Sequence, residues 1–76
     1  MLTETEVETL LASLIPHYES ASLEALDARD EYLALSTSRP NDVEAILSAR
    51  RRWEECEQAR AAIRQSLDEL AERQAA

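Results

Sequence analysis

Apolar residues recur along this chain at alternating spacings of three and four positions, first over residues 7–35 and again over residues 46–70. Such spacing lines up apolar side chains on one side of an α-helix that packs against a partner helix. The pattern therefore predicts two long helices, the first over about residues 4–36 and the second over about residues 42–73. The predicted hairpin core consists of Val7, Leu11, Leu14, Tyr18, Ala25, Tyr32, Ile46, Trp53, Ile63, Leu67 and Leu70.

Polar residues mark the ends of the two predicted helices. Thr3 is spaced to cap the first helix, with Glu6 as its partner three positions later. A loop is expected at about residues 37–41, and Asn41 is expected to cap the second helix with Glu44 as its partner. Together these signals predict an all-α chain whose residues 1–76 form one domain, an antiparallel helical hairpin.

Pro16 interrupts the first predicted helix. Proline lacks the backbone N–H and its ring clashes with the carbonyl of Ala12, which costs roughly 3 kcal/mol inside a helix. The apolar spacing nevertheless continues in phase on both sides. The sequence leaves open a single kinked helix or a short helix followed by a second one.

Antiparallel packing fixes which residues of the two helices should meet. With the turn near Arg39, Ala25 is expected opposite Trp53, and Tyr32 opposite Ile46. The small residues of the first helix then face the largest residue of the second, as interdigitated packing requires. Arg60 is the one charged residue on the apolar line of the second helix. It is expected across the Tyr18 ring or near Glu19.

The first helix carries more apolar surface than one partner helix can cover. Ile15, Leu26 and Leu33 lie about 80–100° around the helix from its core line, and Leu23 lies further out. A second copy of the chain could cover this flank and complete a homodimeric four-helix bundle. A different protein is the alternative, and the sequence does not choose between them.

The chain is acidic, with a formal net charge of −8 and no glycine. Residues 1–38 carry eight acids and one arginine, whereas residues 39–76 carry eight acids and seven arginines. This excess argues against direct nucleic-acid binding and against docking on an anionic membrane. No apolar run is long enough to span a membrane, and a single cysteine permits no internal disulfide. We expect a cytoplasmic protein.

Few residues in the sequence suggest chemistry. His17 and Cys56 are the only soft metal ligands, too few for a zinc site, and no Glu-x-x-His motif is present for a di-metal bundle. A phosphate-binding loop is ruled out by the lack of glycine. We therefore predict no enzyme activity, no metal and no cofactor.

The residues left as candidates suit binding to another protein. Arg51 can pair with Glu54 or Glu55 along its own helix, and Arg50 or Arg51 can reach an acidic patch on a partner. The acids of the first helix can serve solubility, or can imitate a phosphate backbone. The candidate partner-binding residues are Ile15, Leu23, Leu26, Leu33, Glu19, Asp30, Arg50 and Arg51.

These features predict a small regulator that sequesters or inhibits a partner protein, such as a transcriptional regulator or an assembly ATPase. One alternative is a secretion or assembly chaperone, or an obligate small subunit; another is an acidic DNA mimic. In architecture alone the chain resembles small helical hairpins, among them secretion chaperones and phage-encoded host-takeover proteins.

Overall fold

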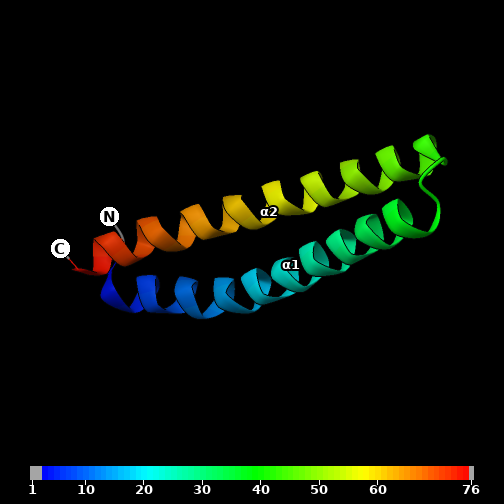
Figure 1. The fold of residues 1–76 in the computed structure, drawn as a ribbon. Coiled ribbons are helices and arrows are strands. Elements are labelled where there is room, and N and C mark those ends of the chain that lie inside the picture. The colour runs from blue at the N-terminus through cyan, green and yellow to red at the C-terminus, as the bar shows by residue number, and fades with distance from the viewer. Residues whose placement is uncertain (1–2, 76) are drawn as a thin grey trace.

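The computed structural model describes residues 3–75, which form two helices joined by a tight turn. Helix α1 spans Glu4–Ser38 and helix α2 spans Val43–Ala75. They run antiparallel, so the start of α1 and the end of α2 lie together, far from the turn (Figure 1). The rod measures 54 × 15 × 14 Å. The prediction of an all-helical chain with two packed helices is confirmed.

Helix α1 runs without a break through Pro16. This resolves the alternatives that the sequence left open in favour of one continuous helix. Figure 1 shows that α1 changes direction between its blue and cyan parts, which is where the proline removes one backbone hydrogen bond. The apolar residues on both sides keep their phase, so packing on α2 can hold the helix together across the bend.

Side chains cap both helices at their N-termini. Thr3 Oγ1 accepts a hydrogen bond from the Glu6 backbone N–H at 3.1 Å, as predicted. The cap of α2 was predicted wrongly: the Asp42 carboxylate, and not Asn41, accepts from the Ala45 N–H at 3.3 Å. Asp and Asn stabilise a helix N-terminus about equally well, so residue preference alone does not distinguish Asn41 from Asp42 as the cap.

The turn is shorter than the sequence suggests because α1 extends to Ser38. The hydroxyls of Ser36, Thr37 and Ser38 donate to the carbonyls four residues earlier, at 2.9, 2.9 and 2.7 Å. Bonded in this way, the polar residues remain in the last turn of the helix instead of opening a loop. The Arg39 N–H then bonds to the Leu35 carbonyl, and the chain reverses over residues 39–42.

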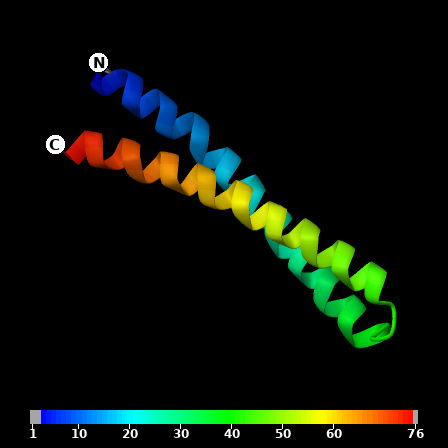
Figure 2. The ribbon, with the colours of Figure 1, turned by 90° about the horizontal axis from the view of Figure 1, so that it is seen from above.

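The two most deeply buried residues of the described chain are alanines of α1. Ala25 and Ala28 of α1 are each only 1% exposed, and Ala49 of α2 is 6% exposed. Viewed from above, the helices cross near the middle of the rod (Figure 2). Among the described residues no large side chain is fully buried. The rod has a radius of gyration of 16.9 Å, whereas a compact chain of this length would have about 11 Å.

Enlarging a buried alanine should separate the helices. We expect Ala25→Leu to lower the free energy of unfolding by about 1–3 kcal/mol, because the added atoms have no space between the helices. The matched control is Ala62→Leu, which adds the same atoms at an exposed position of α2. Urea unfolding followed by helical circular dichroism measures both variants. Equal stability of the two would contradict the close approach at Ala25.

Candidate protein-binding site

One face of α1 exposes a set of large apolar side chains. Exposed fractions are 48% for Ile15, 68% for Leu23, 45% for Leu26 and 50% for Leu33. These four residues were singled out in the sequence as the flank that α2 could not cover. Their exposure reflects the geometry of a hairpin, in which each helix has a partner on one side only.

Carboxylates border this apolar surface. Glu19 and Asp30 are both exposed, and Asp30 pairs with Arg29 at 3.5 Å in a contact open to water. Glu19 and Asp27 each lie one turn of helix from Leu23. The most exposed leucine of the chain is thus flanked by acids on its own helix, an arrangement suited to an apolar pocket with a basic rim.

Arg52 joins the two helices, a role that the sequence reasoning missed. Its Nη1 lies 2.6 Å from Glu31 Oε2 and its Nη2 lies 3.4 Å from Asp27 Oδ2. The hydrogen bond to Asp27, and then the charge of Glu31, raise the pKa of Arg52 above its usual value. The available signal was the spacing of the two acids, four apart on α1, which lets one guanidinium from a facing helix reach both.

Arg50 and Arg51, which precede Arg52, are exposed and form no ion pair with α1 among the described residues. Arg50 Nε pairs with Glu54 Oε1 at 3.1 Å along α2. Arg51, which we expected to pair with Glu54 or Glu55, is exposed and has no carboxylate of the described residues within 4 Å. Both candidates therefore lie on the exposed surface of α2.

Two aromatic residues stack between the helices, a contact that the predicted oppositions did not include. The rings of Tyr32 and Trp53 are 5.6 Å apart between centroids, with planes inclined by 29°. We had expected Tyr32 opposite Ile46 and Trp53 opposite Ala25. The indole is half-buried, and its Nε1–H donates to Glu57 Oε1 at 3.3 Å. Long aromatic side chains can stack even when their backbone positions are not directly opposite each other.

Tyr18 lies in a basic environment. The Arg60 guanidinium lies over its ring at 6.0 Å from the centroid, which is one of the two positions expected for Arg60. Hydrogen bonding from Arg64 lowers the pKa of Tyr18, and Arg60 acts in the same direction. Arg64 also pairs with Asp68 at 3.2 Å.

The residues predicted for the hairpin core line the contact between the helices. Val7, Ala25 and Leu70 are buried. The others are half-buried: Leu11, Leu14, Tyr18, Tyr32, Ile46, Trp53, Ile63 and Leu67. Cys56, a free thiol, is half-buried on the same line, whereas His17 is exposed.

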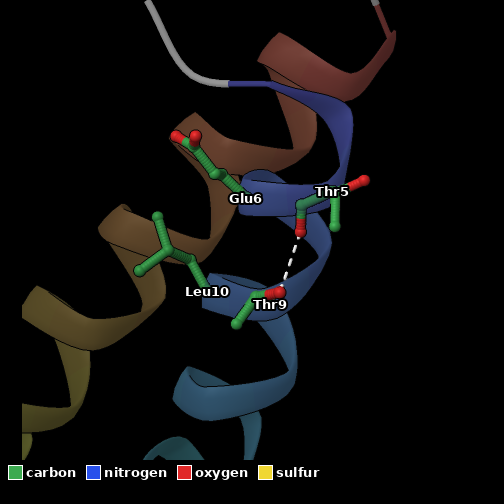
Figure 3. A pocket seen from close by; sticks show the side chains of 4 residues that line it. All are labelled: Thr5, Glu6, Thr9 and Leu10. Atoms are coloured by element: carbon green, nitrogen blue, oxygen red, sulfur yellow. Dashed lines mark hydrogen bonds between the residues drawn. The ribbon is translucent and has the colours of Figure 1, made fainter.

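The surface of the described residues has shallow hollows. One, of about 370 Å³, is lined by Thr5, Glu6, Thr9 and Leu10 (Figure 3). Its Thr9 hydroxyl donates to the Thr5 carbonyl at 2.9 Å, so that group is already engaged. A second, of about 410 Å³, lies on α2 beside Trp53. Within the described residues no group of three His, Cys, Asp or Glu side chains could hold a metal ion.

Neither described helix has an apolar stretch long enough to cross a membrane. Comparison of the chain with family models, with curated proteins and with solved structures found no match.

Removing the Arg52 bridge should weaken the contact between the helices. We expect Arg52→Gln to lower the melting temperature by a few degrees at low ionic strength, with Arg50→Gln as the matched control because its pair lies within α2. The difference should shrink in high salt, which screens exposed pairs. If the two variants melt alike at low salt, the bridge does not stabilise the hairpin.

Arg64 should control the ionisation of Tyr18. The positive guanidinium stabilises the phenolate, so Arg64→Gln should raise the pKa of Tyr18 toward its ordinary value of 10.0. Ultraviolet titration in a Tyr32→Phe background follows Tyr18 alone. Arg51→Gln serves as the control and should leave the titration unchanged. An unchanged pKa in Arg64→Gln would contradict the contact.

Proposed function

We propose that this chain is a small, homodimeric, cytoplasmic regulator that binds another protein and sequesters or inhibits it. The single observation behind this proposal is the apolar face of α1, where four large side chains remain about half exposed or more. Exposed apolar surface of this kind commonly marks a site of protein association. The proposed target is a transcriptional regulator or an assembly ATPase. The proposed role is that of a phage-type host-takeover protein.

The chemistry of the face suggests how a partner would bind. Leu23 is the most exposed of the large apolar residues, and Glu19 and Asp27 flank it. A partner would accept Leu23 in an apolar pocket and pair its own basic residues with an exposed carboxylate on the same side of α1, such as Asp30. This is helix-in-groove recognition, in which a few apolar anchors supply affinity and the surrounding charges supply orientation.

Action by binding fits the side chains better than catalysis does. The hollows are shallow, and their polar groups bond to neighbours on the same helix. An acidic DNA mimic is the weaker alternative, because Arg52 already pairs with two acids of α1. An export chaperone or an obligate subunit would use the same apolar face, but such a chain would need its partner to remain folded or soluble.

Charge placed at Leu23 should abolish partner binding. A tagged chain is purified from its native cell, and co-purifying proteins are identified by mass spectrometry. We expect Leu23→Glu to lose the partner, because a carboxylate cannot enter an apolar pocket. The matched control is Leu47→Glu, at a position of α2 that is 54% exposed, and it should retain the partner.

Three results would decide against this proposal. A partner retained equally by both variants would remove Leu23 from the interface. A partner lost steeply with added salt would indicate the DNA mimic, since apolar docking resists screening. A chain that aggregates when purified alone would indicate the obligate subunit.

A further inference from the structure

The exposed flank of α1 contains a second line of residues with heptad spacing. Ile15, Glu19, Ser22, Leu26, Arg29 and Leu33 follow one another at intervals of four, three, four, three and four. On a period of 3.6 these residues share a stripe roughly 80° wide, which lies about 90–100° around α1 from the line that contacts α2. We call this set the outer stripe. In a square four-helix bundle each helix contacts two neighbours at such an angle.

The side-chain types of the outer stripe are arranged symmetrically about its centre. Apolar residues stand at its ends, Ile15 and Leu33. Next inward come opposite charges, Glu19 and Arg29, and at the centre a small residue, Ser22, beside a large one, Leu26. When the stripe is laid antiparallel on a copy of itself, Ile15 meets Leu33, Glu19 meets Arg29, and Ser22 meets Leu26. Every pair is then apolar with apolar, acid with base, or small with large.

We propose that the outer stripe binds the same stripe of a second copy of this chain in an antiparallel register centred on Glu24, with Glu19 of each copy paired to Arg29 of the other. This inference rests on the homodimer of the proposed function and names its interface. Self-complementarity is the property that an isologous interface demands, whereas a stripe for an unrelated protein has no need of it. Parallel pairing would place Glu19 beside Glu19 and Arg29 beside Arg29, so the charges also select the orientation.

Helix α2 has a second self-complementary line of residues, on the same side of the hairpin as the outer stripe. Trp53, Glu57, Arg60 and Arg64 are spaced by four, three and four. Laid antiparallel on a copy, Glu57 meets Arg60 and Trp53 meets Arg64, so this order too is self-complementary. Its centre lies between Gln58 and Ala59.

The contacts between the helices show that the centre of the outer stripe on α1 and the centre of the line on α2 lie at nearly the same position along the rod. Arg60 lies over Tyr18, and Trp53 stacks on Tyr32. The midpoint of each helix between these contacts is Ala25 on α1 and the Cys56–Glu57 step on α2. Each centre of symmetry falls within one helical turn of that level. A single two-fold axis can therefore relate both helices to their copies.

The surroundings leave the outer stripe accessible. Arg29 and Asp30, its nearest ion pair, are about half exposed or more and 3.5 Å apart, so that Arg29 can turn to a new partner at little cost. The bridge from Arg52 to Asp27 and Glu31 lies on the other side of the hairpin on a period of 3.6. A second copy would leave that bridge undisturbed.

A charge-swap cycle tests the register. The mass and dissociation constant of the purified chain are measured by sedimentation equilibrium, and helix content by circular dichroism. We expect the wild-type chain to be a dimer. Glu19→Arg and Arg29→Glu should each weaken it by about tenfold or more, because each places like charges together at two symmetric sites. The double variant reverses both charges and should return to within about threefold of wild type.

The matched control is Glu24→Arg, which makes the same charge change on the opposite side of α1 from the stripe. Both Glu19→Arg and Glu24→Arg reduce the net negative charge. Each variant therefore weakens the general repulsion between chains, which by itself would favour association. A dimer weakened only by Glu19→Arg therefore reports a specific pair.

Two results would overturn the inference. A wild-type chain that is helical and monomeric at all concentrations excludes the homodimer itself, including the one in the proposed function. A dimer that tolerates Glu19→Arg as well as Glu24→Arg, or that the double variant fails to restore, excludes this register only. Partner capture by Leu23 can succeed or fail independently of either result.

Discussion

The limiting constraint in this molecule is that two helices can cover only one side of each other. A hairpin has a line of contact and no enclosed interior, and its two best-buried side chains are small ones, Ala25 and Ala28. The alanines let the backbones approach, while larger residues such as Trp53 and Tyr32 lie at the edges, half in water. Stability therefore depends on the length of the line and less on any single residue.

Polar contacts supplement this thin core at its edges. Arg52 reaches two carboxylates on one edge, and Arg60 and Arg64 surround Tyr18 elsewhere along the line. Each contact is individually weak, yet each one favours a limited range of axial offsets of the helices. Apolar side chains can slide past one another with little penalty, so the charged and aromatic contacts help to fix the register.

Much of this architecture could be predicted from the sequence, because helix length, helix period and caps are local properties. The two helices, the Thr3 cap and the exposed flank around Leu26 all follow from spacing. The Tyr32–Trp53 stack could not be predicted in this way, and the spacing of the two acids on α1 did not by itself identify Arg52 as their partner. The stack and the bridge depend on how far one rod is shifted along the other and on the reach of long side chains, and neither is encoded in the spacing of one helix.

The antiparallel arrangement also sets an order of assembly. The four residues of the turn, 39–42, hold Leu35 and Ile46 within a short loop of each other, whereas Val7 and Leu70 are separated by almost the entire chain. Closing a long loop costs more entropy than closing a short one, so contacts form first beside the turn and then extend outward, as a zipper closes. The Tyr32–Trp53 stack is therefore among the early contacts, and the part of α1 before Pro16 packs against α2 last. The end of the rod that holds the start of α1 and the end of α2 is therefore also the end from which the hairpin opens.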